Sequence, residues 1–256
     1  MEQRERVGTF RYRETTAQEI LLQQKRRWAQ KASLRQIYAN YIALVFKFCV
    51  SGRTLEIGAG SGLLKECGYD VLATDIELMT DIDVVSDAQS LAFRDQSFDN
   101  IVAIDAFHHM ERPVRFLSEA CRVLKPGGRL VLLEPGITPV SRLFYQLLHR
   151  EPVDLKVNPL EDGPVDIHRH PFLGNQGLGT LLVTRFKGSL GEIVPGISLI
   201  EHQWIGSLAY PLSGGFQRWS LVPAGVVRPV LALESLIDST LGQWCAFRLL
   251  ITLQRE

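Results

Sequence analysis

The chain has 256 residues, of which 46% are hydrophobic and 22% are charged, and its formal net charge is zero. This composition excludes disordered, collagen-like and coiled-coil proteins, and the balanced charge gives no global attraction for nucleic acid. The length suits one α/β domain. The four cysteines form no C-x-x-C pair, which argues against a zinc cluster or a disulfide framework and favours a reducing compartment.

Residues 1–32 are polar and basic and are expected to form a solvated arm or helix, with a patch for a membrane surface or an acidic partner as the alternative. They lack the apolar segment of a secretory signal, and no stretch reaches the roughly 18 apolar residues of a spanning helix, so we expect a cytoplasmic protein. From Ser33 to Phe48 apolar residues recur at helical spacing. Ser33 and Gln36 have the pattern of a capping box, and Gly52 is expected to end this helix.

A glycine-rich turn follows the apolar run at 54–57. Gly58, Gly60 and Gly62 occupy alternate positions, which is typical of a buried strand that turns into a helix around a bound group. The amides and dipole at the start of that helix suit an anionic group, although a tight turn without a ligand is the alternative. The helix must be short, because Gly68 comes soon after.

Further strands are expected over 69–75, 83–86, 98–104 and 129–133, with a helix over 113–124 and a tight turn at 125–128. Strands that alternate with short helices indicate βαβ units and a parallel sheet. Ligands of such sheets bind at the carboxyl ends of the strands, where we expect Asp75, Asp87, Asp105 and Glu134 to gather. Asp75 lies 17 residues after Gly58 and could accept two ribose hydroxyls.

Four blocks in this order resemble class I S-adenosylmethionine-dependent methyltransferases of the type 11 small-molecule subgroup: LEIGAGSG (55–62), VLATDIE (71–77), DAQSLAFRDQSFDNIVAIDAFHHM (87–110) and RVLKPGGRLVLLEP (122–135). The resemblance covers about residues 34–136. It implies an α/β fold, a Rossmann-like doubly wound seven-stranded mixed sheet whose last strand is antiparallel, with helical and loop lid insertions. A single domain over 33–256 would comprise a cofactor-binding core at 53–136 and acceptor-side and lid elements at 137–245.

The resemblance implies S-adenosyl-L-methionine as cofactor and S-adenosyl-L-homocysteine as product. In that picture the first strand and its turn line the methionine end, Asp105 lies near the amino group, Asp75 holds the ribose hydroxyls, and Ile76 and Asp87 contact the adenine. The full set of expected cofactor contacts is Glu56, Gly58, Ala59, Gly60, Asp75, Ile76, Asp87, Ala88 and Asp105. The spacing G-x-G-x-G, with Leu63 where a third glycine would stand in a dinucleotide site, argues against an NAD enzyme.

His108 and His109 follow the strand at 98–104, and an unperturbed histidine titrates near neutral pH. Similar small-molecule methyltransferases use a base after this strand, so His109 is favoured slightly over His108 as the base, with Glu134 orienting it or holding the acceptor. The alternative is that the pair only packs against the cofactor. No metal site is expected, because neighbouring residues in a loop seldom converge on an ion without a third ligand.

The remaining residues indicate a helix over 142–149, polar loops over 166–177 and strands over 197–204 and 246–254. His168 and His170 are expected in an exposed loop. The insertion at 210–240 contains an apolar helix pattern over 226–237. We expect it to form a hydrophobic lid over the acceptor, with a membrane-facing surface as the alternative.

The sequence therefore predicts a methyltransferase that acts on a small-molecule or glycan-like acceptor, with oxygen as the favoured atom. Carbon methylation of a quinone or lipid precursor is the alternative reaction. A catalytically inactive cofactor-binding scaffold is the alternative of another class. No nucleic-acid partner is expected, peripheral membrane contact stays open, and the sequence does not define the oligomeric state.

Overall fold

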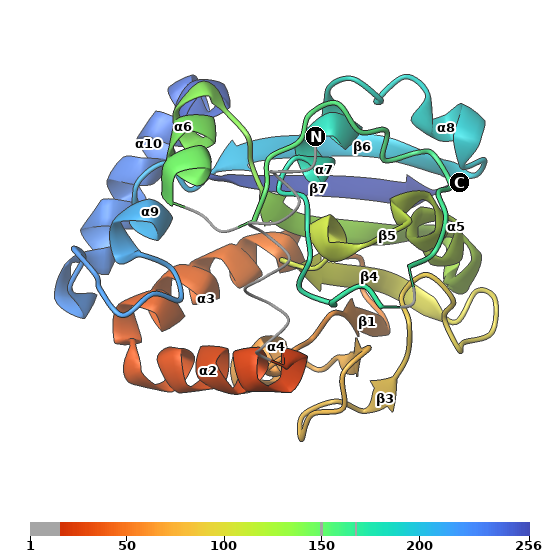
Figure 1. Cartoon of the computed structure of the whole chain (residues 1–256), viewed down its shortest axis with the longest axis horizontal. Helices are drawn as coiled ribbons and strands as arrows, with labels where there is room; N and C mark the ends of the chain where they lie inside the picture. The colour runs from red at the N-terminus through yellow and green to blue at the C-terminus, as the bar shows by residue number, and fades with distance from the viewer. Residues whose placement is uncertain (1–15, 149–150, 167) are drawn as a thin grey trace.

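The computed structural model describes residues 16–148, 151–166 and 168–256. At its centre lies a seven-stranded sheet with the order β3-β2-β1-β4-β5-β7-β6 (Figure 1). Strands β1 to β5 pair in parallel, whereas β7 runs antiparallel to both β5 and β6. The strands are β1 (Thr54–Ile57), β2 (Leu72–Asp75), β3 (Val84–Val85), β4 (Phe98–Ile104), β5 (Leu124–Pro135), β6 (Ile197–Ile205) and β7 (Arg248–Arg255). The predicted mixed sheet with an antiparallel last strand is confirmed.

Helices cover both faces of this sheet. One face is packed by α3 (Ala32–Lys47), α4 (Leu63–Glu66), α9 (Ala209–Ser213) and α10 (Val227–Cys245). The other is packed by α5 (Pro113–Val123), α7 (Leu178–Val183) and α8 (Leu190–Ile193). The remaining elements are α2 (Ala17–Gln30), the short turn η1 (Phe107–His109), α6 (Pro139–Leu148) and η2 (Ala224–Val226).

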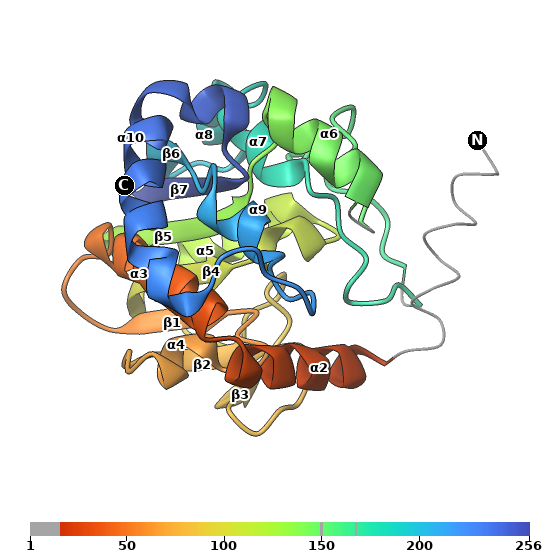
Figure 2. The same cartoon turned by 90° about the vertical axis from the view of Figure 1, so that its left-hand side faces the viewer.

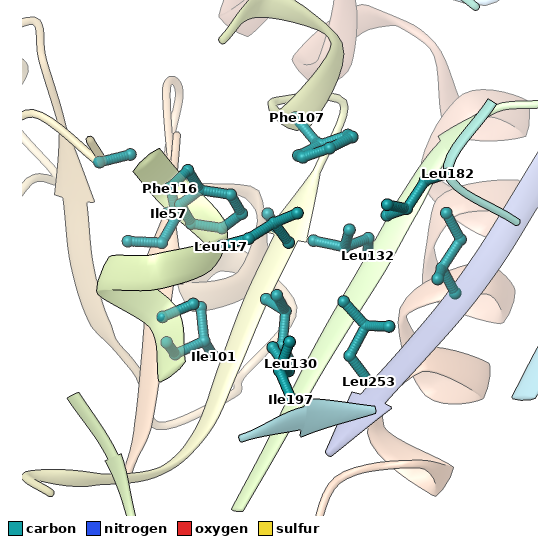
Figure 3. Packing of buried hydrophobic residues seen from close by; sticks show 14 of the residues in the cluster. Ile57, Ile101, Phe107, Phe116, Leu117, Leu130, Leu132, Leu182, Ile197 and Leu253 are labelled. Atoms are coloured by element: carbon teal, nitrogen blue, oxygen red, sulfur yellow. The ribbon is translucent and has the colours of Figure 1, made fainter. Parts of the chain in front are cut away.

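Strand residues alternate between these two layers. On β5, Leu130 and Leu132 pack toward α5, while Val131 packs toward α3. Figure 3 shows the layer on the α5 side of the sheet, where Phe116 and Leu117 of α5 lie over the central strands. Because successive side chains of a strand point to opposite faces, an uninterrupted apolar strand is buried on both sides. The sheet is thereby fixed in register, and the carboxyl ends of β1, β2, β4 and β5 meet at one edge.

The N-terminal helices differ in detail from the prediction. The capping box belongs to α2, where Thr16 accepts from the Glu19 amide and Glu19 accepts from the Thr16 amide. The predicted box at Ser33 and Gln36 is wrong, because α3 begins earlier, at Ala32, and Ser33 is buried within its first turn. The helix also ends at Lys47, before Gly52. The part of 1–32 that precedes residue 16 lies outside the described residues.

Lys31, at the junction of α2 and α3, is bound by main-chain oxygens from a distant loop. Its ammonium donates to the carbonyls of Ser213 (2.5 Å), Gly215 (2.6 Å), Gln217 (3.1 Å) and Trp219 (2.8 Å). Burial, and secondarily the charge of Arg27, lowers the pKa of this lysine. The contacts fix the loop after α9 to the N-terminal helices.

Three other elements extend beyond their predicted bounds. Strand β5 begins at Leu124, which pairs with Phe98 of β4. The next pair is Arg129 with Asn100, so the residues of the predicted turn at 125–128 lie within a shift of the register. Helix α10 continues to Cys245, beyond the predicted end at residue 237. Helix α6 begins at Pro139, and the predicted end of this helix at His149 lies outside the described residues. Among the described residues, no helix is both long and apolar enough to cross a membrane.

Candidate cofactor and acceptor site

Asp75 at the end of β2 reaches across to the glycine-rich turn after β1. Its Oδ2 accepts from the Gly60 amide at 2.8 Å, and its Oδ1 accepts from the Glu77 amide at 2.9 Å. Burial raises the pKa of Asp75, while these amides oppose the rise. Since a carboxylate has about four lone-pair sites, each oxygen can still accept a ribose hydroxyl.

Glu56 on β1 is a buried acid with an unpartnered oxygen. Its side chain is 4% exposed, and Oε2 lies without a hydrogen-bond partner among the described residues. Burial raises the pKa of Glu56 to about 8, although the charge of Lys65 opposes the rise. A buried carboxyl group with a free oxygen suits a cationic partner, such as the ammonium of an amino acid.

The glycines of the turn allow close approach of neighbouring elements. Gly58 has a φ of +66°, and a Cβ there would come within 2.5 Å of the Ala106 Cβ. Gly60 has a φ of +53°, and a Cβ there would lie 3.0 Å from a methyl group of Leu21 on α2. Both positions therefore require glycine, because a side chain would be strained and would collide with a neighbour.

The residues expected at the adenine, namely Ile76, Asp87 and Ala88, differ in their exposure and in their contacts. Ile76 is 54% exposed directly after Asp75, which leaves a free apolar side chain beside the candidate ribose acid. Ala88 is buried. Asp87 is exposed, and its Oδ1 accepts from the amide of Gln89 at 2.8 Å and from the Gln89 side chain at 3.2 Å. Asp87 thus shapes its own loop, while Ile76 presents a surface that a flat ring could cover.

Asp105 after β4 is held by two protein groups. Its Oδ1 accepts from Arg248 Nη1 at 2.5 Å, and its Oδ2 accepts from the Tyr38 hydroxyl at 2.8 Å. Burial alone would raise the pKa of Asp105, but Arg248 holds it below its ordinary value. The φ of +55° at Asp105 is uncommon for a residue other than glycine. The acid expected near the cofactor's amino group is therefore also the partner of a buried arginine.

Glu134 at the end of β5 organises the turn η1. Its side chain is fully buried, and its Oε1 accepts from the amides of Ala106 (3.0 Å) and Phe107 (2.8 Å). Its Oε2 accepts from the His108 amide at 3.2 Å and lies 2.6 Å from His108 Nδ1. One carboxylate thus fixes both the main chain of η1 and the first imidazole of the His-His pair.

His108 lies between two carboxylates. Its Nδ1 faces Glu134, and its Nε2 is 3.3 Å from Oε2 of Glu151. Burial alone would lower the pKa of His108, but the charge and hydrogen bond of Glu134, followed by those of Glu151, raise it to about 10. This histidine is consequently an imidazolium at neutral pH and cannot accept a further proton.

His109 has the opposite character. Burial, and then the charge of His108, lowers the pKa of His109 to about 3, so its ring is neutral. Its Nδ1 is buried without a hydrogen-bond partner among the described residues, and its ring packs on Phe172 with centroids 5.5 Å apart. The expectation that these histidines titrate near neutral pH is therefore wrong for both, because each ring is removed from water beside fixed charges.

Glu151 also completes a group of three metal-binding side chains. Ligand atoms of His108, His109 and Glu151 all lie within 4.8 Å of one another, so the three could hold an ion. The expectation of no metal was based on the lack of a third ligand, and Glu151 is such a ligand. In this structure, however, both nitrogens of His108 face carboxylates, and the two imidazoles lie against each other in a tilted arrangement with centroids 4.0 Å apart.

A cavity of about 560 Å³ opens beside His108. Met110, Glu111, Arg169, Gly174 and Asn175 are among its lining residues. Arg169 donates to the His109 carbonyl at 2.7 Å, so the loop that contains it is attached to η1. Among the described residues, none of the candidate cofactor contacts lines this cavity. Its lining carries charges of both signs, which suits a polar small molecule.

The sequence did not point to Arg248, Tyr38 or Glu151 as site residues. Arg248 left a signal, since it is a charged residue at the start of an otherwise apolar strand. Tyr38 appeared only as an apolar position of a helix, although its hydroxyl contacts Asp105. Glu151 lies in a loop without a pattern of its own, and only the fold brings it to His108.

Residues 55–132 match a family model described as a methyltransferase domain, of type 11. The demethylmenaquinone methyltransferase of Renibacterium salmoninarum is 34% identical over 115 residues, which cover 38% of this chain and 48% of that protein. The 27-O-demethylrifamycin SV methyltransferase of Amycolatopsis mediterranei is 35% identical over 101 residues, which cover 31% of this chain and 37% of that protein. The chain thus spans less than half the length of either relative.

A solved structure gives a longer match. The crystal structure of the cyclase SpnF covers 86% of this chain, with 81% of that protein matched, a TM-score of 0.51 and 19% identity. At this level of identity the match concerns the fold alone.

Proposed function

We propose that this chain transfers the methyl group of S-adenosylmethionine to a small-molecule acceptor. The basis is that it contains a class I S-adenosylmethionine-dependent methyltransferase domain of type 11. The observation that carries the proposal is the contact of Asp75 with the Gly60 amide, next to the unpartnered oxygen of Glu56. Together they offer acceptors for two ribose hydroxyls, which an adenosyl amino acid shares with a nucleotide, and for an ammonium group, which a nucleotide lacks.

The cofactor supplies an electrophilic methyl group on a sulfonium. The protein mainly has to align the acceptor, and holding such a geometry can account for roughly 7–11 kcal/mol of a barrier. Asp75 and Glu56 would fix the ribose and amino ends. Glu134 fixes the main chain of η1, and His108 of this turn lines the cavity that we assign to the acceptor.

We infer oxygen as the methylated atom, with His109 as the proton acceptor. His109 is neutral, so it need not lose a proton before it takes one, whereas His108 is already protonated. A base as weak as His109 suits an acidic hydroxyl, such as that of a phenol or an enol, better than an alcohol. His108 would then be a positioning residue that holds Glu134 and Glu151 together.

Carbon methylation of a quinone precursor is the second candidate. The relative from Renibacterium salmoninarum, named as a demethylmenaquinone methyltransferase, favours it. A ring that carries an acidic hydroxyl would be a suitable substrate for this reaction too, because ionisation of the hydroxyl activates the neighbouring ring carbon. Mass spectrometry of the product after incubation with phenols and with hydroquinones would distinguish the two, since a methyl ether and a methylated ring fragment differently.

Asp75→Ala is expected to weaken binding of S-adenosylmethionine by about 10- to 150-fold. The reason is the loss of charge-assisted hydrogen bonds to the ribose, worth about 1.5–3 kcal/mol. Calorimetric titration of the purified chain measures this change. Asp70→Ala is the matched control, because Asp70 is an exposed aspartate just before the same strand.

Asp75 also supports the glycine-rich turn, so Asp75→Asn is needed beside the alanine variant. It keeps one acceptor oxygen and is expected to bind with intermediate affinity. A folded Asp75→Ala protein that binds as tightly as the wild type would show that Asp75 does not hold the cofactor. Wild-type binding without turnover on any acceptor would support the inactive scaffold instead.

The pH–rate profile is expected to show no histidine inflection between about pH 4 and pH 9, because the two pKa values lie near 3 and 10. The measurement is kcat/KM across this range with a phenolic acceptor whose own pKa is determined separately, for the wild type and for His109→Gln. The variant is expected to lose activity by about 10²- to 10⁴-fold, the usual contribution of a base. An inflection near pH 6.5 that disappears in His109→Gln would contradict these pKa values.

A further inference from the structure

The outward face of α10 is apolar. Leu233, Leu236, Leu241 and Trp244 are each more than half exposed, and Leu236 reaches 69%. Leu233, Leu236 and Trp244 lie within about 80° of one another around the helix and form one stripe, and Leu241 lies at the edge of this stripe, toward the side that packs on the sheet through Val227. Monomeric soluble proteins rarely expose contiguous apolar area of this kind, and where they do it is often an interaction site.

Neighbouring elements enlarge this stripe. Helix α6 contacts α10 and exposes Leu143 (61%) and Leu147 (72%) one turn apart. The loop after α9 adds Trp219 and Leu221, of which Leu221 is 72% exposed. Figures 1 and 2 place α6, α9 and α10 together at one end of the sheet. We call the exposed apolar residues of α6, α10 and this loop the α6–α10 surface.

The acids of α10 turn away from this surface. Glu234 is 3% exposed and accepts from the amides of Leu208 (2.8 Å) and Ala209 (2.5 Å). Asp238 accepts from the Gly206 amide at 2.8 Å and from the Ser207 amide at 3.2 Å. Both carboxylates therefore bind the segment that enters α9; Glu234 is buried, and Asp238 is only partly exposed.

The exposed charges of the same region are all positive. The structure describes all residues of 139–147 and 208–247, and every exposed charged residue in these two ranges is an arginine. These are Arg142 on α6, Arg218 in the loop after α9 and Arg228 at the start of α10. Leucine and tryptophan side chains flanked by arginines match the composition of segments that lie in the interface of an anionic bilayer.

We propose that the α6–α10 surface docks the protein on anionic lipid membranes, with Leu236, Leu241 and Trp244 entering the interface and the arginines contacting lipid headgroups. A second copy of the chain is a less suitable occupant. Pairing this surface with itself would place Arg142, Arg218 and Arg228 against the same cations, with no exposed acid from these segments to balance them. The proposal does not depend on which acceptor is methylated.

The test is co-sedimentation of the purified full chain with phosphatidylglycerol vesicles and with phosphatidylcholine vesicles. Binding is expected to the anionic vesicles, to weaken with added salt, and to be much lower on the zwitterionic ones. Tryptophan fluorescence should shift to shorter wavelength on binding, since Trp219 and Trp244 are 46% and 57% exposed in the free protein.

Two variants separate the apolar and the charged contributions. Leu236→Ser is expected to lower partitioning by about tenfold or more, from the lost burial of one leucine. Arg228→Gln is expected to lower it about fivefold on anionic vesicles only. Ile193→Ser on α8, at the other end of the sheet, is the control, because Ile193 is also an exposed apolar residue at 42%.

Leu236 is mostly solvated, so its replacement leaves the fold intact, which a thermal melt verifies. Equal binding to both vesicle types, or equal losses for Leu236→Ser and Ile193→Ser, would overturn the proposal. So would a dimer in the absence of lipid that Leu236→Ser dissociates, because the surface would then belong to a second copy.

Discussion

Asp105→Asn is expected to lower the free energy of unfolding by about 3 kcal/mol, the low end of the usual effect of removing one partner of a buried ion pair, because the Asp105 side chain is 29% exposed. Arg248, its partner, is 1% exposed, and its Nε already lies without a hydrogen-bond partner among the described residues. Its remaining contacts are the Leu133 carbonyl at 3.5 Å and the face of Tyr210 at 5.1 Å. Chemical denaturation of the variant and the wild type measures the difference.

The control is Asp95→Asn, because Asp95 pairs with Arg122 at 2.8 Å but is 70% exposed. Exposed pairs contribute about 0–1 kcal/mol, so this variant is expected to unfold almost as the wild type does. The pKa of Asp105 is lowered in the folded protein. Its stabilising contribution is therefore present above the unfolded carboxyl pKa of about 3.9 and is lost as pH falls through the folded value. Equal losses in the two variants at neutral pH would contradict the structural role of Asp105.

The double variant Asp105→Asn/Arg248→Met separates stability from ligand binding. Removing both charges is expected to recover part of the lost stability, since a buried pair can be replaced by apolar groups at little cost. If Asp105 also contacts the amino group of the cofactor, the double variant will stay weak in binding S-adenosylmethionine. Recovery of both properties would assign Asp105 to the ion pair alone.

Glu134→Gln is expected to disrupt η1 and to lower turnover by about 10²-fold. Both carboxylate oxygens accept from N–H donors of residues 106–108, so the amide of a glutamine would set one donor against another in either orientation. Hydrogen bonds to charged groups are worth about 1.5–3 kcal/mol each, and a displacement of about 1 Å near the reacting groups can cost 10²-fold in rate. Denaturation and kcat measurements check the two effects.

The same variant should move the titration of His108. The pKa of His108 is about 10 in the folded protein, above the unfolded value of about 6.5. Its stabilising contribution is thus complete below pH 6.5 and is lost as pH rises through about 10. In Glu134→Gln we expect the pKa to fall toward the ordinary value, as followed by the imidazole proton resonances.

Glu151→Gln is the matched control for this prediction. Glu151 is the second carboxylate beside His108, at 3.3 Å, but its side chain is 11% exposed and it contacts none of the η1 amides that Glu134 holds. It is expected to lower the His108 pKa with a smaller loss of turnover. An unchanged His108 titration in Glu134→Gln would show that Glu134 does not set the state of this histidine.

Local patterns predicted the cofactor half of the fold well. The run at 98–104 coincides with β4, because an uninterrupted apolar segment that ends in Asp105 has only one reasonable interpretation as a buried parallel strand. The short α4 followed from the spacing of Gly62 and Gly68. The approach of Asp75 to the turn followed from strand order, since the ends of β1 and β2 are neighbours.

What failed depended on contacts between distant segments. A capping pattern at Ser33 was overruled because Ser33 is buried in the first turn of α3, 3.4 Å from the Ser220 hydroxyl. The end of α10 was placed too early because the prediction followed an apolar pattern only to residue 237, whereas the helix continues through Asp238, whose carboxylate binds the amides of Gly206 and Ser207. The state of His108 could not be inferred either, because it requires Glu151, which no local pattern places beside it.

The four carbonyls around Lys31 have a consequence for the two ends of the molecule. Helix α2 lies over the turn at Gly60 through Leu21, while the loop held by Lys31 contains Trp219 at the apolar end. If α2 moved away from the sheet by rotating about Lys31, the loop held by Lys31 would be displaced with it. If only the first residues of α2 moved, the loop would keep its position. Acetylation of Lys31 would leave three of these oxygens without their donor and uncouple the two regions mechanically.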